Sequence, residues 1–247
     1  MRAVKAIALR ELRTYFGSPT AYVLVAVYVL LTGYFFYSDV VFFVTFGGYL
    51  PPTGLWRYVF LDFRLVTLLV LPLLTMRLFA EERKLGTIEL LWTYPVRDRQ
   101  LVLGKFLAAW VFFLILVVIA MVPFVVFYFF YRFAPGPPLA GLLGLVLLGT
   151  SFIACGIAAS TLTENQVVAA MLTYGTLVLF WFMTWNESVS GEALVQVLLL
   201  LSLFDHYYNF TLGVIDTRDV AYFAIFILVA LFVALRSLQS RVWRGVA

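Results

Sequence analysis

Charged residues are scarce in this chain of 247 residues. They make up 12% of it, against about 25% in soluble domains. Hydrophobic residues account for 64%, and the mean hydropathy of +1.02 applies to the whole length, so the apolar excess is not confined to one anchor segment. These proportions exclude a soluble globular enzyme, a disordered chain and a nucleic-acid-binding protein.

Side chains that carry chemistry are equally few. One cysteine, Cys155, excludes an intramolecular disulfide and a cysteine-rich metal site, and its small neighbours indicate a helix-packing face. The single histidine, His206, lacks metal co-ligands, so we interpret it as part of an outer interfacial aromatic belt. No GxxxxGK[ST] motif is present, which excludes a Walker-type ATP site on this chain.

An intramembrane enzyme is the weakest class of function for this sequence. The pair Glu81-Glu82 resembles the start of the EExxxR motif of CAAX-type membrane proteases, but Gly86 stands where the arginine is required. No nucleophile–base pair or metal cluster accompanies it. The sequence therefore predicts no catalytic, cofactor or metal site on this chain.

Six apolar runs are long enough to cross a bilayer as helices, which takes about 20 residues each. They are Pro19–Phe43, Leu61–Phe79, Leu101–Tyr131, Leu139–Leu162, Val167–Trp185 and Val220–Leu238. The third is long enough to tilt, to extend past the membrane or to bend at Pro123. Leu194–Phe204 is too short to cross, so we expect it to be re-entrant or interfacial.

Lysine and arginine divide unequally between the two sides of these spans, which predicts orientation. One set of connections holds Arg2, Lys5, Arg10, Arg13, Arg77, Arg83, Lys84, Arg97, Arg99, Lys105, Arg236, Arg241 and Arg244. The other holds Arg57, Arg64, Arg132 and Arg218. The first set is expected in the cytoplasm with both termini. The segment Met1–Phe16 mixes charged and apolar residues at helical spacing, which predicts an amphipathic helix in the interface.

The connection after the second span is the most informative stretch. Gly86-Thr87 offers a helix start, Ile88–Tyr94 makes about two apolar turns, and Pro95 stops them. Leu90, Leu91 and Trp92 together would present apolar surface to the cytoplasm, which indicates a partner site. The alternative is a solvated connector.

The run AEERKLGTIELLWTYPVRDRQLVLGKF resembles the hallmark segment of ABC-2 type transporter permeases. The outer segment LSLFDHYYNFTLGVIDTRDVAYF is similar to the gliding-motility-associated subgroup, and ALRELRTYFGSPTAYVL resembles the family's opening interfacial helix. The resemblance implies an all-α polytopic membrane protein in one domain over 1–247, with six transmembrane helices. It also implies an interfacial connecting helix (1–18), a cytoplasmic coupling helix between spans two and three (82–95) and a re-entrant outer segment before span six (187–217).

The resemblance also implies partners and a contact site. The family pairs two permease chains, identical or different, with two separate ATPase subunits that bind ATP and magnesium, and such permeases lie in the bacterial or archaeal inner membrane. An exporter is the expected output, and a periplasmic or auxiliary membrane subunit is a further expected partner. The residues expected to contact the ATPase are Glu82, Arg83, Leu85, Gly86, Thr87, Glu89, Leu90, Leu91 and Tyr94.

Two questions stay open from the sequence. The chain is either the permease of an exporter or a non-transporting membrane subunit that transmits ATPase motion to a periplasmic partner. The aromatic outer half of the fifth span either faces lipid or lines a substrate path. The path residues would be Phe180, Trp181, Met183 and Trp185.

Overall fold

The computed structural model describes residues 2–46, 54–86, 97–130, 132–183 and 200–242, and these residues form helices and short connections without a strand. The helices are α1 (Arg2–Gly17), α2 (Pro19–Phe46), α3 (Gly54–Thr75), α4 (Arg77–Lys84), α6 (Asp98–Ala120), α7 (Val122–Phe130), α8 (Gly136–Leu162), α9 (Gln166–Phe182), α11 (Leu203–Thr211) and α12 (Thr217–Val242). The prediction of an all-helical polytopic chain is confirmed.

Among the described residues, five stretches of helix are long and apolar enough to cross a membrane. They are Pro19–Phe46, Leu55–Lys84, Asp98–Phe130, Gly136–Leu162 and Thr217–Ser240. The fifth predicted span corresponds to α9, which has 17 residues and is apolar but shorter than this length. Six spans therefore remain a prediction, while a multi-pass membrane protein is supported by the five longer stretches.

The second and third spans differ in detail from their predicted limits. The helix predicted to begin at Leu61 already begins at Gly54, because the charge of Arg57 interrupts the apolar run without interrupting the helix. The predicted bend near Pro123 takes the form of a break at Met121, between α6 and α7. Proline lacks the N–H that would bond the carbonyl one turn earlier, so the helix yields there.

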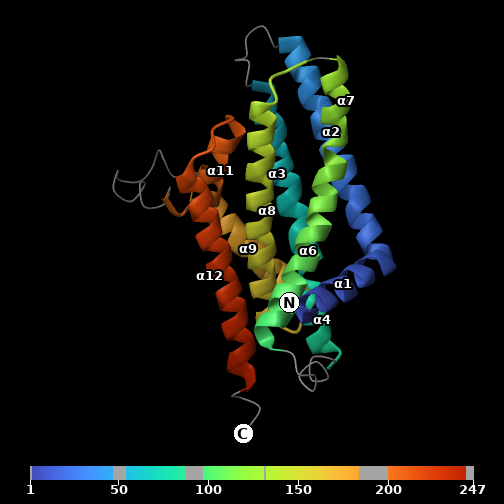
Figure 1. The fold of residues 1–247 in the computed structure, drawn as a ribbon, viewed down its shortest axis with the longest axis vertical. Coiled ribbons are helices and arrows are strands. Elements are labelled where there is room, and N and C mark those ends of the chain that lie inside the picture. The colour runs from blue at the N-terminus through green and yellow to red at the C-terminus, as the bar shows by residue number, and fades with distance from the viewer. Residues whose placement is uncertain (1, 47–53, 87–96, 131, 184–199, 243–247) are drawn as a thin grey trace.

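Helix α8 is the centre of the bundle (Figure 1) and packs against α3, α6, α9, α11 and α12. Its neighbours approach closely where α8 carries glycine. A Cβ at Gly156 would overlap the Thr75 side chain of α3, and one at Gly144 would overlap Phe210 of α11. These small residues let large side chains of the surrounding helices reach the α8 backbone.

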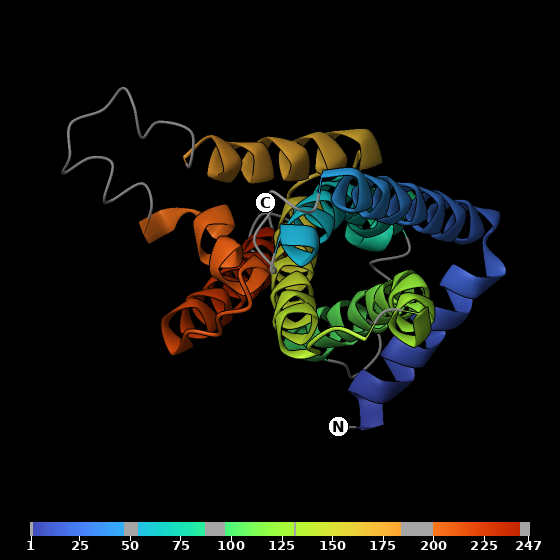
Figure 2. The same cartoon turned by 90° about the horizontal axis from the view of Figure 1, so that it is seen from above.

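Helix α1 crosses the end of the bundle instead of running along it, as Figures 1 and 2 show. Its apolar side packs on α6: Ile7 lies against Gly104, and the Tyr15 and Phe112 ring centroids are 5.2 Å apart. None of its residues is fully buried, as the predicted amphipathic interfacial helix requires.

The bundle has two ends, which differ in the helices that form them. The basic end holds α1, α4, the first turn of α6 and the C-terminal end of α12, and the distal end holds α11 and the first turns of α3 and α12 (Figure 1). Helices α3 and α4 connect the two ends as one nearly continuous stretch, Leu55–Lys84, interrupted at Met76.

Candidate functional site

A buried lysine organises the basic end. The Lys105 side chain is 1% exposed, and its Nζ lies 3.0 Å from Glu11 Oε1 and 2.9 Å from Glu82 Oε1. It also donates a hydrogen bond of 2.7 Å to the Leu78 carbonyl and lies 5.1 Å from the Phe79 ring centroid. Lys105 belongs to α6, Glu11 to α1 and the remaining partners to α4, so this cluster joins three helices.

Local sequence explains why the three helices meet here. Leu78 and Glu82 are one helical turn apart on α4, so one face of this short helix presents both a buried leucine and a carboxylate. Gly104 allows Ile7 of α1 to lie directly on α6 beside Lys105. A charged lysine can be buried only where carboxylates and a carbonyl accept hydrogen bonds from its ammonium group, which is the arrangement present.

Helix α4 leads directly into the predicted coupling segment. It ends at Lys84, Leu85 follows with 67% exposure, and Gly86 has φ of +68°. A left-handed glycine at this position is a common helix terminator, so Gly86 ends α4; the helix predicted to start at Gly86-Thr87 stays a prediction. Thr87, Glu89, Leu90, Leu91 and Tyr94 lie outside the described residues.

Glu82 has a different placement from the one expected of an ATPase contact. Its side chain is 13% exposed and faces Lys105, with Arg10 Nη2 at 3.7 Å. The predicted contact set thus contains one residue whose carboxylate is used inside the chain. Arg83 lies beside it near the end of α4, and Leu85 is the exposed member of the set nearest the segment.

A cavity of about 580 Å³ opens next to this cluster. Its lining comes from α1, the start of α2, the end of α3 and α4, with Lys105 as the contribution of α6. Polar side chains, among them Tyr15, Thr20 and Arg77, form one part, and Val23, Leu24 and Leu73 form another. The cavity is therefore amphipathic.

At the distal end, α11 is attached to α3 by three contacts. The Tyr207 hydroxyl donates a 2.7 Å hydrogen bond to the Phe60 carbonyl, and both residues are fully buried. Arg57 lies 4.9 Å from the Tyr208 ring centroid, and Arg64 lies 5.1 Å from that of Phe204. Burial raises the pKa of Tyr207, so its hydroxyl keeps its proton and remains a donor.

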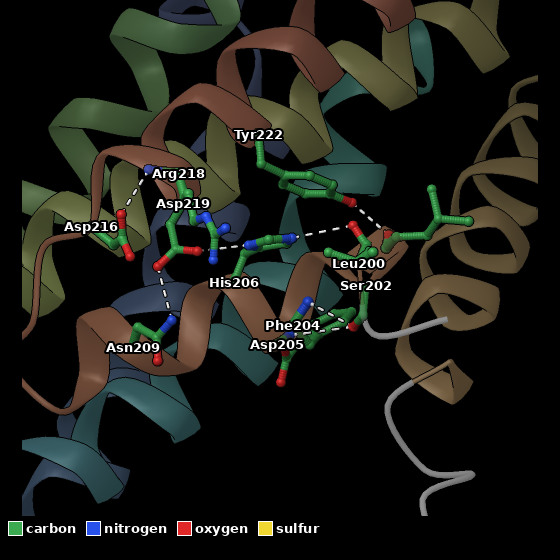
Figure 3. Close-up of polar contacts among 11 residues, drawn as sticks. Leu200, Ser202, Phe204, Asp205, His206, Asn209, Asp216, Arg218, Asp219 and Tyr222 are labelled. Atoms are coloured by element: carbon green, nitrogen blue, oxygen red, sulfur yellow. Dashed lines mark hydrogen bonds and ion pairs between the residues drawn. The ribbon is translucent and has the colours of Figure 1, made fainter. Parts of the chain in front are cut away.

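Helix α11 is also attached to α12, through the polar contacts drawn in Figure 3. His206 Nδ1 lies 2.7 Å from Asp219 Oδ1, and Asn209 donates a 2.9 Å bond to the other oxygen of this carboxylate. The His206 ring stacks on Tyr222 at 4.0 Å. His206 therefore belongs to a packed polar cluster between two helices, where it serves the buried carboxylate of Asp219, which is 3% exposed; its place in an interfacial aromatic belt stays a prediction.

The residues predicted to line a substrate path pack within the chain where they are described. Trp181 lies 5.6 Å from Phe204 and 5.5 Å from Arg64, and Phe180 meets Phe226 of α12 at 5.3 Å. Met183 follows the last residue of α9, and Trp185 lies outside the described residues. Phe180 and Trp181 remain partly exposed, so the lipid-facing belt and the substrate path both stay predictions.

The sequence analysis missed Lys105 and Glu11 as site residues. Lys105 was counted only as a cytoplasmic charge, although it stands inside an apolar run that begins at Leu101. Glu11 is the acidic residue of an otherwise basic amphipathic segment. The sequence signals that could have identified them were the lone positive charge of Lys105 inside a span and the lone negative charge of Glu11 in the basic N-terminal helix.

Within the described residues, no three histidine, cysteine, aspartate or glutamate side chains group as metal ligands would. Cys155 is a free, buried thiol in α8. The described residues thus contain a charged cluster at the basic end, a long helical stretch and a polar cluster at the distal end.

Comparison with known proteins agrees with this arrangement. The model of a family described as ABC-2 family transporter protein matches residues 64–242, which is more than half of the chain. No curated protein matches the chain. With its apolar helices and this match, the chain belongs to the ABC-2 transporter family, as a multi-pass membrane permease component that partners an ATPase subunit.

Proposed function

We propose that this chain is the permease subunit of an ABC exporter, driven by separate ATPase subunits through the segment 82–95. The observation that carries the proposal is the Lys105 cluster. It ties α4, which enters the segment, to α1 and α6 through contacts of 3.0 Å or less. A displacement of the segment therefore acts on three helices together.

The long stretch Leu55–Lys84 carries this displacement across the membrane. A helix is stiff along its axis, and this one is firmly packed, because Phe60, Phe63 and Leu71 are fully buried. At its distal end it holds α11 through Tyr207 and the two arginine–aromatic contacts. Motion that begins beside the ATPase thus reaches α11, and α12 follows through Asp219.

The assembly is two permease chains with two ATPase subunits that bind ATP and magnesium. The basic end faces the cytoplasm of a bacterial or archaeal inner membrane, as the distribution of lysine and arginine indicates. Leu85, Leu90 and Leu91 supply apolar contact with the ATPase, and Arg83, Gly86, Thr87, Glu89 and Tyr94 complete the contact. Glu82 acts inside the permease, as the lower anchor of Lys105.

The substrate path is formed between two permease chains. Met183 and Trp185, at and beyond the end of α9, remain the proposed path residues, because Phe180 and Trp181 are used in packing α9 against α12 and α11. Export of an amphiphilic or polymeric cargo fits the shortage of charged residues in the middle of the spans.

A second function is favoured by the distal junction. Helix α11 contacts both α3 and α12. A displacement of these helices would therefore move α11, which could transmit it to a periplasmic partner while no substrate crosses the membrane. In that case the chain transmits ATPase work mechanically. Stimulation of ATP hydrolysis by a soluble periplasmic protein, in place of a transported substrate, distinguishes this function from export.

The test is site-directed photo-crosslinking in the purified complex of permease and ATPase. Leu85→Cys, in a Cys155→Ala background, carries the crosslinker at an exposed position next to the segment. We expect a crosslink to the ATPase subunit, and none from the matched control Val214→Cys at the distal end, which is similarly exposed. An ATPase that co-purifies but is never captured from Leu85 would contradict the proposal.

A further inference from the structure

We propose that the cavity at the basic end binds one phospholipid with an ethanolamine headgroup, its phosphate on Arg77 and Tyr15 and its ammonium on Glu81. This is a lipid site between α1, α2, the end of α3 and α4, and at its rim it shares Leu85 with the proposed ATPase contact. Three features support it: an arginine and a glutamate without an ionic partner among the described residues, a buried hydroxyl without a hydrogen-bond partner there, and an apolar wall beside them.

Some charged side chains of the lining form ion pairs with one another, and others do not. Lys105 pairs with Glu11 and Glu82, and Arg10 lies 3.7 Å from Glu82. Arg77 donates a 2.9 Å bond to the Thr20 hydroxyl, and within the described part of the chain no carboxylate pairs with it and no cation pairs with Glu81. One cation and one anion on the same wall therefore remain for a ligand.

Arg77 and Glu81 are spaced for a zwitterion. They stand one turn apart on α4, about 5–6 Å along its surface, and both line the cavity. An ethanolamine headgroup has its phosphate and its ammonium separated by a two-carbon link of similar reach. A guanidinium binds phosphate oxygens through two N–H groups, and a carboxylate accepts from a primary ammonium.

The Tyr15 hydroxyl supplies a further donor. This oxygen is buried, and within the described residues it has no hydrogen-bond partner, which is uncommon for a buried polar atom. Burial, with Glu11 nearby, raises the pKa of Tyr15, so the hydroxyl keeps its proton. Because this oxygen has almost no accessible surface, it reaches a phosphate oxygen in the cavity only when the Tyr15 side chain turns toward the ligand.

The apolar wall lies where an acyl chain would begin. Val23 and Leu24 follow Thr20 by one turn of α2, and Leu73 precedes Arg77 by one turn of α3 toward the membrane interior. Val23 is 61% exposed and Leu73 is 38% exposed, so this wall opens sideways toward lipid. Headgroup, glycerol and chain thus meet polar and then apolar side chains in the order in which a leaflet presents them.

Lipid binding to delipidated permease in neutral detergent, measured by native mass spectrometry, tests the proposal. We expect one phosphatidylethanolamine per chain to bind saturably, and phosphatidylglycerol and phosphatidylcholine to bind more weakly, because the first lacks an ammonium and the second has no N–H to donate. Arg77→Gln should weaken binding by about tenfold or more, and Tyr15→Phe by about two- to fivefold. Glu81→Gln should remove the preference over phosphatidylglycerol.

The matched control is Arg99→Gln, which removes an exposed arginine at the same end of the bundle outside the cavity and should bind like the wild type. Equal binding of the three lipids, or an Arg77→Gln variant that binds like the control, would overturn the proposal. Displacement by glycerophosphoethanolamine, which has no acyl chains, at a concentration equal to that of the lipid would overturn the assignment to a lipid. Lipid-free melting curves of each variant confirm that any loss is not unfolding.

Discussion

Lys105 of α6 and Glu82 of α4 form an ion pair of 2.9 Å between Nζ and Oε1, with the lysine 1% exposed. The pair lies where the long α3–α4 stretch enters the segment proposed to contact the ATPase. Glu11 of α1 contacts the same nitrogen, so Lys105 joins α1, α4 and α6 through its ammonium group.

Lys105→Met should destabilise the permease by about 3–5 kcal/mol, because it leaves two buried carboxylates without their cation. Thermal unfolding is measured by the reaction of Cys155, the one cysteine, with a thiol-reactive dye, since this thiol is buried until the chain opens. Adding Glu11→Gln and Glu82→Gln to Lys105→Met should recover part of the loss. A single variant as stable as the wild type would show that the cluster contributes nothing.

Leu90→Asp or Leu91→Asp should dissociate the ATPase or uncouple it, with the membrane fold intact. Burying a leucine contributes about 1.5–3 kcal/mol, whereas an exposed ion pair contributes about 0–1. Glu89→Ala, the matched control in the same segment, should therefore be mild. ATPase co-purification and ATP-dependent activity at equal expression are the measurements. If the two aspartate variants keep full ATPase co-purification and full activity, the segment is a solvated connector and not an ATPase contact.

Asp219→Ala should cost more stability than His206→Ala, because Asp219 accepts bonds from both His206 and Asn209 and is the more buried partner. Losses of about 1–3 kcal/mol are expected for the aspartate. Arg218→Ala, an exposed neighbour in Figure 3, is the control and should stay within about 0.5 kcal/mol. Thiol-reactive melting of the three variants gives the order, and equal losses for Asp219 and Arg218 would remove the distal junction from the mechanism.

Gly156→Ala should destabilise the bundle by about 1–3 kcal/mol, because the new methyl group overlaps the Thr75 side chain and forces α3 away from α8. Gly175→Ala on α9 is the matched control. It meets nothing within 4 Å, so the gain in helix propensity should leave it neutral or slightly more stable. The same dye assay, with ATPase activity of the complex, measures both; a harmless Gly156→Ala would mean that the α3–α8 contact is loose.

Orientation can be tested in intact cells with a membrane-impermeant maleimide. A cysteine at Asp98, at the start of α6, should be protected, and one at Val214, exposed at the distal end, should be labelled. The buried Cys155 keeps the background low. Labelling at position 98 before cell lysis would reverse the proposed topology.

The sequence by itself determined the helical class, the approximate position of five long apolar helices and the amphipathic helix α1. A bilayer accepts helices of sufficient apolar length whatever their neighbours are. The helices can therefore be predicted from the local amino-acid composition. The predicted start of α3 was too late, because the charge of Arg57 was taken as the end of the apolar run. In the structure the Arg57 guanidinium lies over the Tyr208 ring of α11, a contact between helices far apart in the chain.

Only the tertiary structure decided which charged side chains pair with one another. Lys105 looked like one more cytoplasmic charge and His206 like one more belt residue until Glu11, Glu82 and Asp219 were brought to them from other helices. The cavity beside Arg77 and Glu81, which have no ionic partner among the described residues, forms where α1, α2, α3 and α4 meet. Composition reports how a residue partitions between water and lipid, whereas pairing depends on distances that packing alone sets.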